Sequence, residues 1–195
     1  MTEPCQFYLK VTISRSRLHD FLCQEAPSAA AFKDLEHWLE RDPRRRGDMT
    51  WHELCELGQG TTAAAWVADW TRHLRSPAWC DYDEASQTWQ LAVLEFAQSR
   101  EWIIGALNVF RRVAEFKDLP GRDYLLIYDY LFRKGSVVAA VELTPGASRI
   151  LHEEPPPQVT AEADLQMNRL LRAMDATATY AVQRIFDTDT HKRRC

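Results

Sequence analysis

The sequence lacks the short motifs that mark common catalytic and nucleotide-binding sites. It has no G-x-S-x-G motif, and the glycines of Gly58–Gly60 are followed by neither a third glycine nor a P-loop lysine. His52-Glu53 begins like the H-E-x-x-H zinc motif, but Glu56 stands where the second histidine belongs. The whole chain has only seven glycines, few for a phosphate-binding loop. We therefore expect no catalytic residue and no cofactor.

Cysteine usage excludes two further classes of protein. The five cysteines are widely spaced and form no C-x-x-C pair: Cys5, Cys23, Cys55, Cys80 and Cys195. An odd number at such spacings indicates neither a disulfide framework nor a zinc site. Three of them, Cys23, Cys55 and Cys80, lie in apolar surroundings typical of buried, inert thiols. We expect reduced thiols and no bound metal.

Long apolar runs and an excess of positive charge are also missing. No run approaches the roughly 18 apolar residues that span a membrane, and the first residues lack the basic and apolar parts of a signal peptide. The formal net charge is −4, whereas a nucleic-acid-binding protein needs a basic face. The expectation is a cytoplasmic protein with neither a membrane nor a nucleic-acid partner.

What the sequence does contain is the composition of a globular protein. Apolar residues make up 46% and charged residues 27% of its 195 residues, enough for one domain with a substantial core. We expect a single α+β domain over 1–195. A proline-rich connector at 153–158 should lead to a C-terminal helix, and residues 190–195 should form a frayed tail.

The hydrophobic periodicity predicts a mainly antiparallel sheet of about five strands, packed with about five helices. Strand patterns cover 5–14, 78–82, 88–98, 123–133 and 137–143, with a short edge strand at 148–152. Helical patterns follow Ser14 or Ser16, Ser28, Thr50, and Thr61 or Thr62, and cover 100–117 and 161–175. Residues 176–187 fit a strand by composition and a helix by continuity.

Acidic and aromatic residues alternate around the predicted hairpin at 78–98. This segment has four acids and no lysine or arginine. The residues concerned are Trp79, Asp81, Tyr82, Asp83, Glu84 and Trp89. Three interpretations stay open: a patch for a basic partner surface with aromatic anchors, a carboxylate pair for acid–base catalysis, or an ordinary turn rich in aspartate.

Two other segments carry an open choice. The strand at 123–133 is rich in tyrosine, and Tyr128 and Tyr130 belong to a protein-binding surface if one sheet face meets solvent, or to the core if helices cover both faces. The arginines of 41–46 form either an anion-binding loop or a solvated connector after a helix C-terminus.

In organisation the chain resembles bacterial toxin-immunity proteins, the small cytoplasmic inhibitors encoded beside contact-dependent or type VI-delivered toxins. The resemblance rests on size, mild acidity, the lack of catalytic motifs and the aromatic–acidic segment Trp79–Trp89. It implies a non-catalytic protein that binds one cognate toxin with a basic surface and blocks its active site or substrate groove. It assigns a role to no residue.

Two other functions compete with this one. The first is a regulatory domain that binds a small molecule or nucleotide on a split strand–helix–strand sheet. The second is an enzyme whose active site is assembled from scattered His, Asp and Arg side chains. A homodimer formed through the tyrosine-rich strand is compatible with all three.

Overall fold

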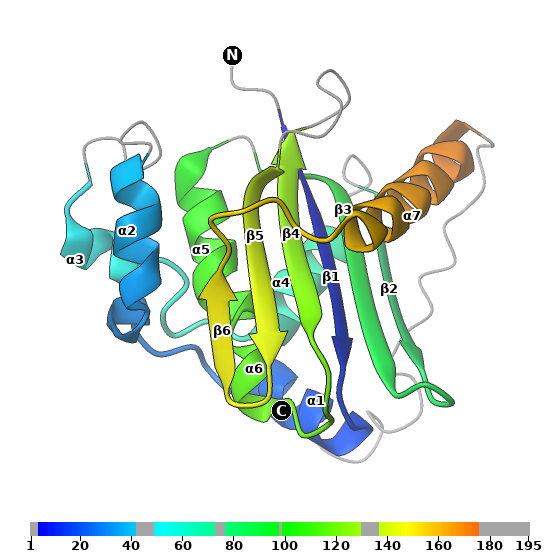
Figure 1. Cartoon of the computed structure of the whole chain (residues 1–195), viewed down its shortest axis with the longest axis horizontal. Helices are drawn as coiled ribbons and strands as arrows, with labels where there is room; N and C mark the ends of the chain where they lie inside the picture. Colours follow the sequence, from blue (N-terminus) through cyan, green and yellow to red (C-terminus); the bar gives the residue numbers. More distant parts are fainter. Residues whose placement is uncertain (1–3, 42–48, 73–76, 98, 130–136, 176–195) are drawn as a thin grey trace.

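A single antiparallel sheet forms the centre of the protein (Figure 1). The computed structural model describes residues 4–41, 49–72, 77–97, 99–129 and 137–175. The strands are β1 (Cys5–Thr12), β2 (Ala78–Asp83), β3 (Thr88–Ala97), β4 (Asp123–Asp129), β5 (Val137–Thr144) and β6 (Ala147–Ile150). Their order in the sheet is β2-β3-β1-β4-β5-β6, and all neighbouring pairs are antiparallel. The predicted α+β class is confirmed, with six strands where about five were expected.

Helices lie on both faces of this sheet. They are α1 (Arg15–Cys23), the 3₁₀ turn η1 (Ala29–Ala31), α2 (Lys33–Arg41), α3 (Trp51–Glu56), α4 (Ala63–Arg72), α5 (Arg100–Phe110), α6 (Val113–Phe116) and α7 (Pro157–Asp175). Helices α1 to α6 lie on one face, called here the helical face, and α7 crosses the other, called the α7 face (Figure 1).

The two faces follow from the period-two pattern of β1. Phe7, Leu9 and Val11 are fully buried in the large core of the helical face, while Tyr8 belongs to a smaller cluster under α7. Successive side chains of a strand point to opposite faces, so this alternation in the sequence decides both layers. The larger core therefore forms where α1 to α6 supply most of the apolar surface.

Phe7 is the centre of the helical-face core. Its ring lies 5.2 Å from Trp70, 5.5 Å from Phe96 and 5.1 Å from Phe110, measured between ring centroids. These partners come from α4, β3 and α5. Tilted and edge-to-face contacts of this kind stabilise a core beyond the burial of area alone. One strand residue thus joins three elements distant in sequence.

Two predicted helix starts have the caps that the sequence indicates. The Thr50 hydroxyl accepts a bond from the Glu53 amide, and the Glu53 carboxylate accepts one from the Thr50 amide, which is a complete capping box. The Ser99 hydroxyl likewise accepts from the amide of Trp102. Both helices begin where a side-chain oxygen satisfies an otherwise unpaired backbone amide.

Two helix boundaries differ from the prediction. The segment 100–117 is split into α5 and α6 at Arg111 and Arg112. The split coincides with the entry of the Arg111 guanidinium into the interior. The last helix begins at Pro157 instead of 161, because proline, which lacks an amide hydrogen, suits the first helical position.

Several predictions fall outside the described residues. They concern the arginines at 42–46, the strand end at 130–133 with Tyr130, the ambiguous segment 176–187 and the tail at 190–195.

A buried ion pair joins α2 to the junction of α5 and α6. One Arg111 nitrogen lies 2.8 Å from an Asp34 carboxylate oxygen, and the arginine side chain is completely buried. Arg111 also donates to the hydroxyl and carbonyl oxygens of Ser148, and its guanidinium lies 4.1 Å from the centre of the Phe32 ring. Asp34 in turn accepts from the amide of Ile150 at 2.7 Å. Because Asp34 lies on α2 while Ser148 and Ile150 lie on β6, this cluster fixes the edge strand to the helices.

Removal of the Asp34 charge should destabilise the protein strongly. We expect Asp34→Asn to lower the free energy of unfolding by about 3 kcal/mol, because it leaves the Arg111 charge buried without its counter-ion. Burial alone would raise the pKa of Asp34, but the hydrogen bond and charge of Arg111 hold it below its usual range. A lowered folded pKa stabilises the protein above the ordinary carboxyl pKa, and this stability is lost as the pH falls through the folded value.

Urea unfolding between pH 3 and 7 measures both effects. The gap between the wild type and Asp34→Asn should shrink toward acid pH. Asp20→Asn, which removes an exposed ion pair with Arg17, is the matched control and should change stability little. A pH-independent gap would contradict the role given to the Asp34 charge.

Candidate functional site

A row of polar side chains crosses the α7 face and takes one residue from each of the six strands. The strand register places each residue directly opposite the next. In spatial order the row is Asp81, Gln90, Lys10, Tyr124, Glu142 and Arg149. Five of these side chains are half-buried and Arg149 is exposed. We call this set the polar row.

The neighbouring row on the same face is apolar and lies under α7. Its members are paired in the same way, and each lies two residues along its strand from a member of the polar row. They are Trp79, Ala92, Tyr8, Leu126 and Ala140. They pack against Ala163, Met167 and Leu170 of α7. Helix α7 therefore covers the apolar row and leaves much of the polar row accessible, which makes the polar row a candidate binding surface.

Charge is distributed unevenly along the polar row. At one end is the half-buried carboxylate of Asp81. In the middle, Lys10 pairs with Glu162 of α7 at 2.5 Å. At the other end Glu142 is held by two exposed arginines, Arg149 at 3.0 Å and Arg122 at 3.4 Å. The surface is thus acidic near β2 and basic near β6.

The turn between β2 and β3 extends the acidic end. Asp83 is exposed and accepts hydrogen bonds from the Ser86 hydroxyl at 2.7 Å and from the Ala85 amide at 3.0 Å. These two bonds hold its pKa below the usual carboxyl range. Glu84 is exposed and forms an ion pair with Arg15. Asp83 therefore stabilises its own turn and stays charged at the surface near neutral pH.

Two of the predicted aromatic anchors are core residues. Trp89 is fully buried and donates from its indole nitrogen to the Cys80 sulfur, 3.3 Å away. Tyr82 is also buried, and its hydroxyl donates to the carbonyl of Ile13 at 3.0 Å. Both side chains point to the helical face. Tyr82 and Trp89 are the strand neighbours of Asp81 and Gln90, and successive side chains of a strand point to opposite faces. The prediction that Tyr82 and Trp89 are exposed aromatic anchors beside the acidic residues is therefore wrong.

Two of the remaining aromatic candidates, Trp79 and Tyr128, lie on the α7 face. Trp79 is half-buried against the cluster under α7, and so is Tyr128. Tyr130 lies outside the described residues. Sequence reasoning named Asp81 but did not assign Lys10, Gln90, Glu142 or Arg149 to the site. Their alternation with buried neighbours is a detectable signal, but only the strand register shows that they form one row.

Cysteines and possible metal ligands are the candidate reactive groups of the described residues. Cys23, predicted to be buried, is half-buried, and its sulfur lies 3.7 Å from His19 Nε2. No group of three or more His, Cys, Asp or Glu side chains among them is arranged to hold a metal. Burial raises the pKa of the Cys80 thiol to about 12 and also raises that of Cys55, so neither forms a reactive thiolate near neutral pH. No helix in the described part of the chain is both long and apolar enough to cross a bilayer.

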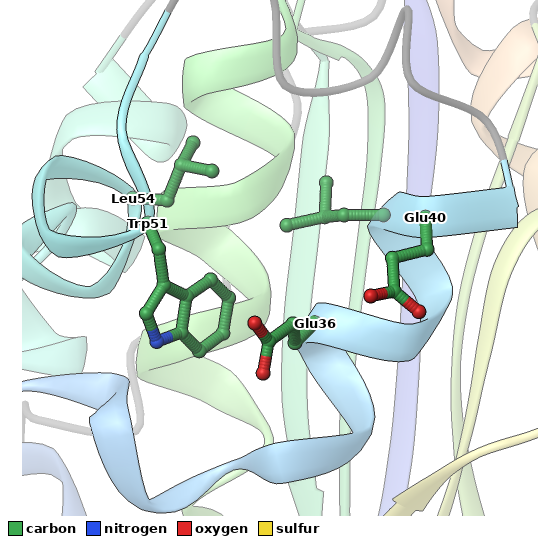
Figure 2. A pocket seen from close by; sticks show the side chains of 5 residues that line it. Glu36, Glu40, Trp51 and Leu54 are labelled. Carbon is green, nitrogen blue, oxygen red and sulfur yellow. The ribbon is translucent and has the colours of Figure 1, made fainter.

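A shallow pocket lies on the other side of the molecule, between α2 and α3 (Figure 2). It is lined by Glu36, Leu39, Glu40, Trp51 and Leu54. The Trp51 indole and the Glu36 carboxylate point into the same space (Figure 2). Among the described lining residues there are two carboxylates and no basic side chain, an arrangement that repels phosphate.

Substitutions should separate the buried from the accessible part of the hairpin. We expect Trp89→Ala to reduce the free energy of unfolding by about 3–5 kcal/mol, because it opens a large cavity in the core. Asp81→Asn on the polar row should change it by less than about 0.5 kcal/mol. Urea titration followed by circular dichroism measures both, and a small effect of Trp89→Ala would contradict its core position.

Comparison of this chain with protein-family models, with curated proteins and with solved structures gives no match. Its function is therefore inferred from its own residues.

Proposed function

We propose that this protein is a non-catalytic inhibitor of the toxin-immunity type, which binds a cognate protein toxin through the polar row and the acidic β2–β3 turn. The observation that carries the proposal is the row itself: six polar side chains in register, accessible beside α7. Binding of this kind needs shape and charge complementarity and no reacting group.

The position of the row on a sheet favours tight recognition. Backbone hydrogen bonds hold the paired strands that carry these side chains, so little backbone entropy is lost when a partner binds. Tyr124 lies between Lys10 and Glu142 in the row and is half-buried. Tyrosine in such a central position is a frequent anchor of protein interfaces.

The charge distribution gives the partner an orientation. Asp81, Asp83 and Glu84 lie at the β2–β3 end, while the exposed arginines Arg122 and Arg149 lie toward β6. A basic toxin surface would meet the β2–β3 end, where carboxylates can take the places of substrate phosphates. Opposite charges steer such an encounter and exclude wrong partners. Inhibition then follows from occlusion of the toxin's groove.

The first test is a pull-down from the native organism with the full chain as bait. Recovery of one stoichiometric basic protein with toxin activity, inhibited by this chain, would support the proposal. A well-folded bait that recovers no such protein would contradict it.

Charge reversal should then locate the surface. We expect Asp81→Lys with Glu84→Lys to weaken binding of the recovered toxin by about tenfold or more, mainly through slower association, because the steering charge is inverted. Asp83 is left unchanged, since it stabilises the turn. Surface plasmon resonance at low and physiological salt measures the rates.

The matched control is Glu36→Lys with Glu40→Lys. It makes the same change in net charge on α2, on the opposite side of the sheet. Equal loss of affinity in both double variants would show that only net charge matters and would reject the polar row as the binding surface.

A further inference from the structure

The contact between α7 and the sheet is more polar than a protein core. Gln6 of β1, which is opposite Tyr128, and Gln166 of α7 are buried. Tyr8 is buried in the cluster under α7, and Tyr128 is half-buried against it. The apolar contribution of α7 comes mainly from Ala163, Met167 and Leu170. Mixed surfaces of this kind are typical of interfaces that open, whereas permanent cores are predominantly apolar.

Two hydroxyls under α7 have no hydrogen-bond partner among the described residues. The oxygen atoms of Tyr8 and Tyr128 are both buried and unbonded. On the other face, one atom of Asn108 and one of Arg111 are also unbonded, but their side chains make other hydrogen bonds. In each tyrosine the unbonded oxygen is the only polar atom of the side chain. A buried hydroxyl without a partner is destabilising and calls for an explanation.

The two hydroxyls lie close together on the α7 face. Tyr8 is opposite Leu126 on β4, and Tyr128 stands two residues further along that strand on the same face. Burial raises the pKa of both phenols, and the nearby carboxylates Glu162 and Asp164 raise it further. Both groups therefore keep their protons, and each presents one donor and an acceptor oxygen toward α7.

The contacts that hold α7 on the sheet permit it to undock. Helix α7 follows Pro155 and Pro156, which restrict the backbone ahead of the helix. Its ion pair to the sheet, Lys10 with Glu162, is partly exposed. The helical-face core lies on the opposite side of the sheet and contains no residue of α7. Undocking of α7 would thus leave the larger core in place.

We propose that the face under α7 is a concealed extension of the partner-binding surface, from which α7 is displaced by an amphipathic helix of the partner whose polar side chains bond Tyr8 and Tyr128. The proposal rests on the function proposed above. With α7 removed, the apolar row adjoins the polar row, which gives an apolar centre with a polar border, as in specific interfaces.

The area of the sheet that α7 covers, called here the seat of α7, indicates which side chains the displacing helix needs. Ala163, Met167 and Leu170 occupy it at spacings of i, i+4 and i+7, the usual pattern of a helix in a groove. An occupant with a similar stripe and an arginine or lysine beside it would donate to the phenol oxygens. A basic helix also fits the acidic end formed by Asp81 and the β2–β3 turn.

Hydrogen exchange of the full chain without any partner tests whether α7 opens. We expect the amides of α7 to exchange at least about tenfold faster than those of β1, through an opening that leaves the sheet protected. Tyr8→Phe with Tyr128→Phe should slow exchange in α7 by about tenfold, because the docked helix no longer buries two unbonded hydroxyls. Equal protection of α7 and β1, or faster exchange in the double variant, would overturn the proposal.

A peptide tests whether the vacated face binds a helix. The probe is a fluorescent peptide of residues 157–175, and the variant is Met167→Asp, which places a charge in the seat of α7. The peptide should bind this variant at least about tenfold more tightly than the wild type, whose seat is occupied. Leu165→Asp is the matched control, since Leu165 is 54% exposed on the same helix, and it should behave as the wild type.

Three outcomes would contradict the concealed surface: equal affinities of the peptide for Met167→Asp and wild type, no binding to either, or cooperative unfolding of the whole Met167→Asp chain. With the recovered toxin, exchange in α7 should rise on binding, and the double tyrosine variant should bind less tightly. Because the partner-free measurements do not involve a toxin, failure of the toxin hypothesis and failure of α7 displacement give different results.

Discussion

The fold of this protein depends on one constraint: the six-stranded sheet has two faces, and most of the helices pack against only one of them. Helices α1 to α4 connect β1 to β2, and α5 and α6 connect β3 to β4, so the chain returns repeatedly to the same side. The ring of Phe7 and its neighbours fill that side, and the Asp34–Arg111 pair fixes its border. The opposite face is covered by α7 over the apolar row, and the polar row is left beside it.

Because the helices cover the two faces unequally, the residues that stabilise the fold differ from those proposed to bind a partner. The helical face holds the large aromatic core, whose burial supplies most of the hydrophobic stabilisation. The α7 face is thereby free to carry charged and hydroxyl groups that a core would not tolerate. Because both faces share the same strands, the backbone that carries the polar row is fixed by the core behind it. A non-catalytic inhibitor needs this combination, since it acts by complementarity alone.

The proposed displacement of α7 would join the two rows into one surface. In the free protein, α7 shields the apolar row from water and limits nonspecific association, because exposed apolar patches bind indiscriminately. A partner helix would have to offset the loss of α7 with better contacts, including the hydrogen bonds that Tyr8 and Tyr128 do not make with α7. Such exchange adds specificity, since only a helix with both an apolar stripe and suitable polar groups would gain from it.

The sequence by itself determined the local structure. Alternation in β1, the capping box at Thr50 and the turn residues at 83–87 are local signals, and each has the structure expected from short-range physics. The sequence did not determine which face of each strand meets solvent. Both sets of side chains in β3 are largely apolar, so the burial of Trp89 and Tyr82 was decided only when β3 and β2 met the helices. The polar row depends on register between strands as far apart in the chain as Lys10 and Tyr124. Register of this kind is fixed by the packing of the whole core, because a shift of one residue would exchange the two faces.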